Sequence, residues 1–222
     1  MSENLSGILN VYKPKGLTSH AVVSRVRKFY GVKRVGHAGT LDPMACGVLP
    51  VLVGSAASVQ ELVMEHDKTY KAGVLFGVTT DTGDVTGTVL DTKAPTFDGA
   101  ALNQAISRFT GEIDQVPPMY SAVKVNGQKL YDLARKGREV ERPARDIIVH
   151  EMELLDFDEN AQKGTLRCKV SKGTYVRTLC HDIGQALGCG GCMYSLRRTM
   201  AAGFTLEESV KLEQVQQEDE EE

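Results

Sequence analysis

Asp42 is the residue whose surroundings in the sequence point most clearly to chemistry. It is the only acidic residue between Asn4 and Gln60. The same segment carries seven cationic residues, namely Lys13, Lys15, Arg25, Arg27, Lys28, Lys33 and Arg34. Positive charge favours the ionised form of a nearby carboxylate, which can then act as a nucleophile. A basic surface of this kind is also typical of proteins that bind phosphate backbones.

Composition alone favours a structural role for Asp42, because an isolated Asp before Pro commonly caps a turn or pairs with a cation. The local sequence shifts that balance, since glycines and a proline predict a tightly turned loop whose backbone can approach a ligand closely. These residues are Gly36, Gly39, Pro43 and Gly47, all within twelve residues. The apolar run at 48–54 predicts a buried segment that anchors the loop, and anchored loops often carry function.

The elements that position this loop are predicted from residue periodicity. Thr18 or Ser19 can cap a helix that ends at Gly31. The apolar residues of that helix recur at helical spacing, at Val22, Val23, Val26 and Phe29. Alternating apolar residues predict a strand over 68–78, with 85–90 as its partner across a turn.

Helices and strands alternate irregularly in the rest of the chain. Apolar residues from 102 to 109 indicate a helix that Gly111 ends, and 174–187 is expected to form another helix. Residues 147–157 and 165–170 have the pattern of strands. Without a βαβ repeat or a clean boundary, we expect one α+β domain with a mixed, largely antiparallel sheet flanked by helices and loops.

Residues 117–145 are expected to form a long excursion from this domain. From 123 to 145 three acidic residues accompany seven basic ones, which are Lys124, Lys129, Arg135, Lys136, Arg138, Arg142 and Arg145. One interpretation is a second surface for nucleic acid; the other is a solvated helical hairpin with its cations outward, which the segment alone favours slightly.

The net charge of -3 averages over two different regions. Residues 207–222 hold eight acidic residues and one lysine, so the preceding 206 residues carry +4. We interpret 207–222 as a solvated, disordered acidic tail. The sequence has no apolar run of membrane-spanning length and no signal-peptide pattern at its start, so we expect a cytoplasmic location.

The cysteines do not predict a metal site or a disulfide framework. Their odd number, five, suits unbridged thiols in a reducing compartment. Cys189 and Cys192 have C-x-x-C spacing, but Cys180 and His181 are adjacent on a predicted helix and point in different directions, so we expect packing residues and no metal. No dinucleotide or NTP motif is present, and we expect no cofactor.

Several segments together resemble the TruB family of tRNA pseudouridine-55 synthases. They follow the order of the family's motifs from residue 7 to about 205. The segments are 7–19 (GILNVYKPKGLTS), 36–43 (GHAGTLDP), 47–50 (GVLP), 67–70 (DKTY), 80–84 (TDTGD), 115–124 (QVPPMYSAVK), 172–179 (KGTYVRTL) and 196–199 (LRRT). One such motif could arise by chance, whereas this ordered set is specific.

The resemblance implies a pseudouridine synthase fold and a reaction. The catalytic domain would cover 1–206, with 117–145 as an insertion that grips RNA. The enzyme would isomerise a flipped-out uridine in the T arm of tRNA, breaking its N-glycosidic bond and rejoining the base through C5. The resemblance implies no cofactor or metal.

The resemblance assigns three catalytic residues. Asp42 matches the nucleophile, which attacks the ribose C1′ or the base, or assists glycal formation; these routes stay open. Arg177 matches the arginine that pairs with this aspartate and holds it ionised. Tyr70 matches the tyrosine that stacks on the target base and is a candidate for proton transfer at C5.

The resemblance also assigns residues that bind the substrate. Tyr175 and Leu196 match residues that line the uridine pocket, and His37 matches the histidine that fills the space left by the extruded nucleotide. The candidate phosphate contacts are Lys13, Lys15, Lys124, Arg135 and Arg138. Lys13 and Pro14 have the alternative role of shaping the loop near the active site.

The chain departs from the family at its carboxyl end, where a PUA domain usually follows. Either this member of the family lacks that domain, or the sequence is a truncated form of a longer protein. In both cases we expect a monomer that needs no protein partner. A dyskerin-like, guide-directed synthase would require the PUA domain and partners, which disfavours it. A non-catalytic RNA-binding module is the alternative from another class, and the intact Asp42, Tyr70 and Arg177 argue against it.

Overall fold

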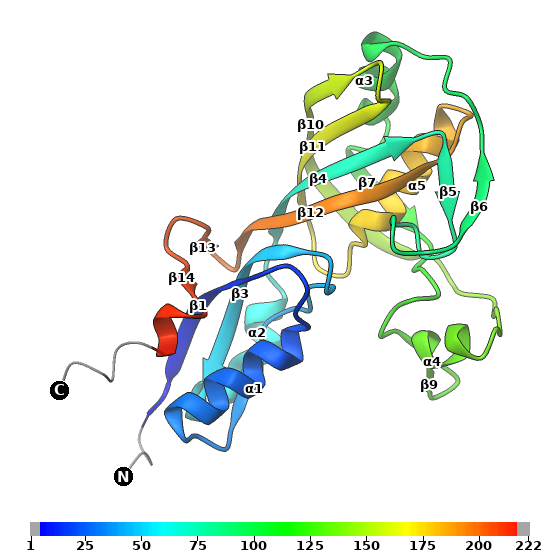
Figure 1. The fold of residues 1–222 in the computed structure, drawn as a ribbon. Helices are drawn as coiled ribbons and strands as arrows, with labels where there is room; N and C mark the ends of the chain where they lie inside the picture. Colours follow the sequence, from blue (N-terminus) through cyan, green and yellow to red (C-terminus); the bar gives the residue numbers. More distant parts are fainter. Residues whose placement is uncertain (1–4, 217–222) are drawn as a thin grey trace. The chain divides into compact units, whose positions relative to one another are not determined.

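The computed structural model describes residues 5–216, which form an α+β fold (Figure 1). Contacts within the chain divide it into two compact units. Unit 1 comprises 1–71 and 196–222, and unit 2 comprises 72–195. Strands β4 (Lys68–Phe76) and β12 (Gly191–Ala201) each begin in one unit and end in the other. The expected single catalytic domain over 1–206 stays a prediction.

Unit 1 is built on a sheet around β3, whose residues from Gly47 to Val53 are all buried. Strand β3 pairs antiparallel with β1 and β2 and parallel with β12, while β14 runs parallel to β1 and β13 antiparallel to β12. The remaining strands are β1 (Gly7–Lys13), β2 (Val35–His37), β3 (Cys46–Val53), β13 (Phe204–Thr205) and β14 (Val210–Lys211). The expectation of a buried segment after the Asp42 loop is confirmed.

Helix α1 (Ser19–Tyr30) lies against this sheet (Figure 1). Thr18 caps it by accepting a hydrogen bond from the Ala21 N–H at 3.0 Å, and Gly31 ends it with φ 62°. The predicted helix is therefore confirmed. Its buried residues join one core cluster with the sheet, formed by Val11, Val22, Val23, Val26, Val35, Leu49, Val51, Val53 and Leu212. A 3-10 helix η1 (Gly54–Val59) and helix α2 (Gln60–Met64) follow β3.

Unit 2 contains an antiparallel sheet covered by two helices. Its hydrogen-bonded order is β4, β11, β10 and β7, with β10 antiparallel to both neighbours. The new strands are β7 (Gly111–Gln115), β10 (Arg145–Asp158) and β11 (Lys163–Val170), and the helices are α3 (Gly99–Ser107) and α5 (Val176–Ala186). The predicted strands at 147–157 and 165–170 and the helix near 174–187 are confirmed. Helix α3 ends at Ser107, and Gly111 begins β7 instead of ending the helix.

The predicted pairing of 85–90 with the strand over 68–78 is wrong. Strand β5 (Val78–Thr80) pairs with β6 (Val89–Thr92), and all four β6 residues are exposed. Residues 81–88 form a loop, because Asp84 accepts hydrogen bonds from nearby Thr side chains and backbone. These local bonds compete with strand pairing, as is common for Asp and Thr in turns. The sequence also left strands β1 and β12 unpredicted.

The expected excursion contains a short hairpin and a short helix, so the helical hairpin alternative is wrong. Strands β8 (Lys124–Val125) and β9 (Gln128–Lys129) pair antiparallel, and α4 (Leu130–Arg135) follows. Leu130 and Leu133 are buried, so α4 has an apolar anchor and not only a solvated face. We call residues 117–145 the insertion.

Residues 207–216, which the sequence assigned to an acidic tail, contribute structure to unit 1. Val210 and Lys211 pair with β1, and η2 (Gln214–Gln216) follows. Leu212 and Val215 are buried, which explains how a strongly acidic segment is held. The acidic run at 218–222 lies outside the described residues. Within 5–216, no helix has the length and apolar character that a bilayer crossing requires.

Leu212 tests this placement of the carboxyl-terminal segment. We expect Leu212→Ala to lower the free energy of unfolding by about 2–5 kcal/mol, as for other buried leucines. Urea unfolding of the full chain measures this, with the exposed neighbour Glu213→Ala as the matched control. Equal effects of the two substitutions would contradict the buried position of Leu212.

Candidate active site

Asp42 lies half-buried in the loop between β2 and β3, and the start of α1 holds that loop. The buried Ser19 hydroxyl donates to the carbonyl of Leu41 at 3.0 Å and accepts from the Leu41 N–H at 2.8 Å. The Gly16 N–H donates to the Pro43 carbonyl at 2.7 Å. The residues on both sides of Asp42 are therefore fixed by hydrogen bonds, which limits the positions that its carboxylate can take.

Arg198 of β12 holds the same loop from the sheet. Its side chain is fully buried, and Nε donates to the Val48 carbonyl at 2.8 Å while Nη2 donates to the Gly39 carbonyl at 3.0 Å. Gly39 has φ 92°, and a Cβ there would lie 3.4 Å from Arg198 Nη1. At Gly47, with φ 111°, a Cβ would lie 2.1 Å from the Arg198 carbonyl oxygen. At Gly47 a side chain would collide with the Arg198 backbone, whereas at Gly39 the positive φ is what favours glycine.

Lys13 is fully buried, and its ammonium donates to the carbonyls of Pro14 at 3.0 Å and Leu17 at 2.7 Å. Burial lowers the pKa of Lys13 to about 8; the nearby Asp42 favours its charged form, and Arg198 opposes it. This geometry favours the role of shaping the loop over the role of contacting phosphate. Lys13 thus belongs to the frame around Asp42.

Strand register places Tyr70 and Leu196 on segments beside the Asp42 loop. Arg197 of β12 pairs with Cys46, the first residue of β3 after the Asp42 loop, and the buried Leu196 is the residue of β12 directly before Arg197. The Thr199 hydroxyl donates to the Thr69 carbonyl at 3.2 Å, which ties β12 to the residue before Tyr70. Tyr70 is buried. Unit 1 therefore brings three of the predicted site residues onto adjacent segments.

His37 ends β2 and is half-buried. Burial lowers its pKa, and the nearby Arg198 and His20 lower it further, which favours the neutral form of the ring. Its Nδ1 is buried and has no hydrogen-bond partner among the described residues.

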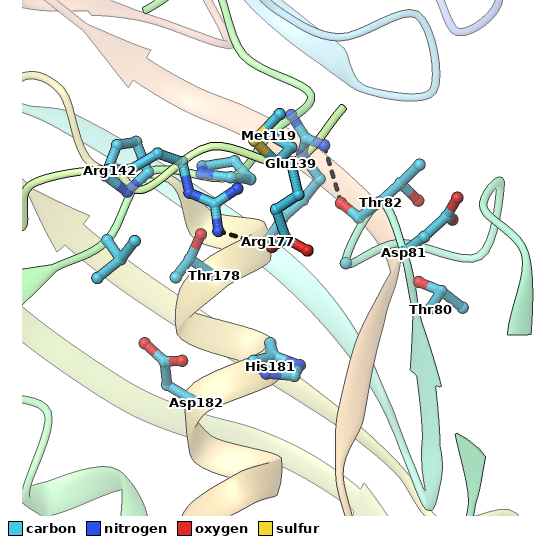
Figure 2. A pocket seen from close by; sticks show the side chains of 14 residues that line it. Thr80, Asp81, Thr82, Met119, Glu139, Arg142, Arg177, Thr178, His181 and Asp182 are labelled. Atoms are coloured by element: carbon cyan, nitrogen blue, oxygen red, sulfur yellow. Dashed lines mark hydrogen bonds and ion pairs between the residues drawn. The ribbon is translucent and has the colours of Figure 1, made fainter. Parts of the chain in front are cut away.

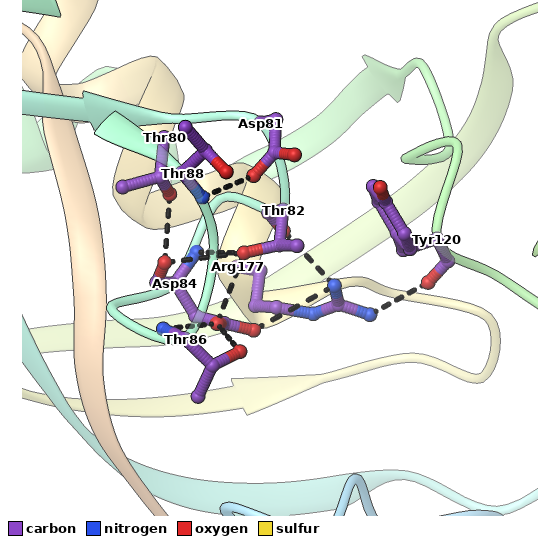
Figure 3. Close-up of polar contacts among 8 residues, drawn as sticks. All are labelled: Thr80, Asp81, Thr82, Asp84, Thr86, Thr88, Tyr120 and Arg177. Atoms are coloured by element: carbon purple, nitrogen blue, oxygen red, sulfur yellow. Dashed lines mark hydrogen bonds and ion pairs between the residues drawn. The ribbon is translucent and has the colours of Figure 1, made fainter. Parts of the chain in front are cut away.

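Arg177 lies in the first turn of α5 in unit 2, where three groups orient its guanidinium (Figure 3). Nη1 donates to the Thr82 carbonyl and Nη2 to the Tyr120 carbonyl, each at 2.9 Å. Asp84 Oδ2 lies 3.8 Å from Nη1, and both side chains of this ion pair are buried. These contacts hold the arginine between the 81–88 loop and the root of the insertion.

Asp84 is in turn held by its own loop. Its Oδ1 accepts from the Thr82 hydroxyl at 3.0 Å and from the Thr86 N–H at 2.9 Å (Figure 3). The loop docks on β12, because the Val85 N–H donates to the Met193 carbonyl at 3.0 Å. The donors from Thr82 and Thr86 therefore orient the Asp84 carboxylate beside the guanidinium of Arg177.

A cavity of about 310 Å³ lies beside Arg177 within unit 2 (Figure 2). Residues of α5, the 80–83 turn and the insertion line it, among them Thr178, His181, Asp182, Glu139 and Arg142. Burial raises the pKa of Asp182, and His181 opposes this effect. Arg142 Nη2 donates to Glu139 at 3.4 Å, while Nε and Nη1 are buried without partners among the described residues. The cavity therefore combines two arginines, Arg142 and Arg177, with the carboxylates of Asp81, Glu139 and Asp182.

The remaining predicted RNA contacts are exposed. These are Lys15 in unit 1 and Lys124, Arg135 and Arg138 in the insertion. The Arg135 guanidinium lies 4.3 Å from the Tyr131 ring centroid, which restricts it without removing it from solvent. Their charges are available to a phosphate backbone.

Two family models match the chain. The model described as TruB family pseudouridylate synthase (N terminal domain) matches residues 27–176, and that described as tRNA pseudouridylate synthase B C-terminal domain matches 177–222. The chain belongs to the TruB family. This TruB enzyme is an RNA pseudouridine synthase, as its motifs predicted.

Curated relatives cover nearly all of the TruB chain. The tRNA pseudouridine synthase B of Alkaliphilus oremlandii is 44% identical over 212 residues, which are 96% of this chain and 70% of that protein. The protein of the same name from Cupriavidus metallidurans is 47% identical over 212 residues, 96% of this chain and 68% of that protein.

Solved structures confirm the pseudouridine synthase fold. A chain in the crystal structure of a Cbf5-Nop10-Gar1 complex is 32% identical with a TM-score of 0.74 and covers 93% of this chain. A chain in the structure of an H/ACA RNP bound to a substrate RNA containing 2'-deoxyuridine is 28% identical with a TM-score of 0.71 and covers 96%. This TruB chain spans about half the length of each, 52% and 53%.

The sequence assigned no role to three residues that organise this TruB site, although each lies in a quoted motif. They are Arg198, Asp84 and Gln115. Gln115 is the one that forms hydrogen bonds with the backbone of Tyr175. Arg198 contacts carbonyls 150 and 159 residues away, so no local spacing reveals them. Within 5–216, no group of three or more His, Cys, Asp or Glu could hold a metal ion. The five cysteines lie in this range, and none forms a disulfide.

Lys13 is expected to make the enzyme's stability depend on pH above 8. Its folded pKa of about 8 is below the ordinary 10.5, so between these values the unfolded chain binds more protons. Stability from this group therefore rises with pH across that window, by at most about 1.4 kcal/mol per pH unit. Below pH 8 both states are protonated, and the cost of burying the charge is fully present.

Urea unfolding of wild type and Lys13→Met at several pH values between 7.5 and 10.5 measures this effect. Lys13→Met lacks the titration while keeping a similar length, so the stability of wild type relative to it should increase with pH. A difference that is constant across the window would contradict the depressed pKa of Lys13.

Proposed function

We propose that this enzyme isomerises the T-loop uridine at position 55 of tRNA, with Asp42 as the nucleophile. Relatives 44% and 47% identical carry the name tRNA pseudouridine synthase B, which supports tRNA as the RNA. The observation that carries the proposal is the frame around Asp42, in which Ser19 and Arg198 hold the loop rigidly from two elements. Such rigidity is what a positioned nucleophile needs.

The reaction is an isomerisation, so no atom is gained or lost. The bond between C1′ and N1 breaks, a bond between C1′ and C5 forms, the C5 proton leaves and N1 gains one. Asp42 assists the first step by attack on C1′, by attack on the base or by promoting a glycal; all three require an ionised carboxylate. Arg177 is proposed to pair with Asp42 and keep it ionised.

The contacts that orient the Arg177 guanidinium support this pairing. A guanidinium has five N–H donors, and the bonds to the Thr82 and Tyr120 carbonyls account for two of them. Together with Asp84, these carbonyls fix the plane of the guanidinium. A guanidinium already fixed in this way needs little reorganisation when it stabilises a second carboxylate.

Tyr70, Tyr175 and Leu196 are proposed to hold the flipped base. Tyr70 stacks on it and takes part in proton transfer at C5, while Tyr175 and Leu196 line the pocket. His37 enters the space that the uridine leaves, and its neutral ring avoids burying a charge among bases. The buried positions of Tyr70 and Leu196 support a pocket closed to water.

The exposed cations are proposed to hold the RNA backbone. Lys124, Arg135 and Arg138 of the insertion grip the T arm, and Lys15 lies on the unit that carries Asp42. We also infer a cytoplasmic location, because a tRNA substrate is found there and unbridged cysteines suit a reducing compartment. We propose that the enzyme acts as a monomer without an obligate protein partner.

Asp42→Asn is expected to reduce pseudouridine formation in a tRNA transcript by at least about 1,000-fold. RNA affinity should change little, because the basic contacts remain. Single-turnover assays, filter binding and mapping of the modified position measure these outcomes, and the exposed Asp91→Asn serves as the control. Full activity of Asp42→Asn, or no product at the T-loop uridine with wild type, would refute the proposal.

RNA binding is expected to weaken steeply with salt, because each phosphate contact releases counterions. Replacing Lys124, Arg135 or Arg138 by Gln should each reduce the slope of log affinity against log salt by about 0.7–0.9. Arg167→Gln is the matched control, since Arg167 pairs with Glu151 and Glu153 on the sheet. A flat salt response would remove the electrostatic part of the proposal.

A further inference from the structure

Gln115 is the last residue of β7 and lies two residues before the insertion begins at Pro117. Only 2% of its surface is exposed. Its side-chain amide forms two hydrogen bonds with the backbone of Tyr175, 60 residues away. The Tyr175 N–H donates to Oε1 at 2.7 Å, and Nε2 donates to the Tyr175 carbonyl at 3.1 Å.

These two bonds determine how α5 begins. Tyr175 is the N-cap residue of α5 with φ -98° and ψ 106°, and its own side chain makes no capping bond. Its carbonyl also accepts the first helical bond, from the Leu179 N–H at 3.2 Å. Because the amide of Gln115 holds the groups on both sides of the Tyr175 Cα, it restricts both backbone dihedrals and the direction of the Tyr175 side chain.

The root of the insertion contacts α5 at a second point. The Tyr120 carbonyl accepts from Arg177 Nη2 at 2.9 Å (Figure 3). Residues 117–119 line the same cavity as Arg177 and Thr178, with Met119 beside Arg177 in Figure 2. Three hydrogen bonds therefore join the start of the insertion to the two residues of α5 that the proposed function uses.

We propose that Gln115 is a positioning residue for pseudouridine formation. Its amide aligns Tyr175 with the base and sets the start of α5 from which Arg177 extends. Since β7 leads from Gln115 into the insertion, the grip on RNA is coupled mechanically to the alignment of these two side chains. The inference rests on the proposed roles of Tyr175 and Arg177.

Gln115→Leu keeps the volume and removes both hydrogen bonds. We expect it to reduce the single-turnover rate on a T-arm RNA by about 10–100-fold, the size of effect that a small misalignment produces. RNA affinity should stay close to that of wild type, because no phosphate contact is lost. Gln104→Leu, at an exposed position of α3, is the matched control for the substitution itself.

A double-mutant cycle with Tyr175→Ala separates positioning from general stability. If Gln115 acts by aligning the Tyr175 ring as well as Arg177, adding Gln115→Leu to Tyr175→Ala slows the reaction by a smaller factor than Gln115→Leu does in wild type, so the effects are not additive. Leu166→Ala, a buried change in β11, shows how much rate is lost by destabilising unit 2 alone. Loss of rate beyond this control, with a non-additive cycle, supports the inference.

Gln115→Glu adds a pH signature. A protonated Glu reproduces both hydrogen bonds, whereas an ionised Glu faces the Tyr175 carbonyl with a second acceptor. Its rate relative to wild type should therefore rise as the pH is lowered from 8 to 6. A pH-independent ratio overturns the inference.

Additive effects in the cycle, or a loss confined to RNA affinity, also overturn it. A different result marks failure of the proposed function: Tyr175→Ala reacts as fast as wild type, which removes the role of Tyr175 and the inference with it. In every other case Tyr175→Ala is slow, and the cycle decides on Gln115 alone.

Discussion

Arg198 donates hydrogen bonds to the carbonyls of Gly39 and Val48, one on each side of the Asp42 loop. A buried guanidinium is costly unless its N–H groups have acceptors, so the loop and the arginine stabilise each other's positions. Gly47 allows this close approach, because a Cβ there would collide with the Arg198 backbone, and Gly39 supplies the positive φ that its turn needs. The half-buried carboxylate therefore has a rigid support that begins in the sheet.

Lys13 and Arg177 are also buried cations that donate to backbone carbonyls, but only Arg177 has a buried carboxylate as a counter-ion. Lys13 and Arg198 donate to neutral backbone carbonyls, so their positive charge still acts on the Asp42 loop. Arg177 has Asp84 as a buried counter-ion, and that carboxylate is held by Thr82 and Thr86. Carbonyl acceptors fix orientation, whereas the ion pair also reduces the cost of burying the arginine.

Elements with a strong local pattern were predicted correctly. Helix α1 has a Thr cap, a helical apolar stripe and a terminal glycine, all of which act within a few residues. The partner of β5 was placed wrongly, because the Asp84 loop replaces strand pairing over 81–88 with bonds to its own backbone. Strand β14 was missed, since its two residues are stabilised by pairing with β1 and not by any local pattern.

The sequence by itself determined the TruB family, the α+β class and the candidate residues Asp42, Tyr70 and Arg177, because motif order and residue type are local properties. Only the tertiary structure showed that Lys13 is buried, that Arg198 holds the Asp42 loop, that Asp84 pairs with Arg177 and that Gln115 bonds to the backbone of Tyr175. The physical reason is that most of their partners are backbone carbonyls and N–H groups. Almost every residue carries such groups, so a sequence cannot show which of them a distant side chain will meet.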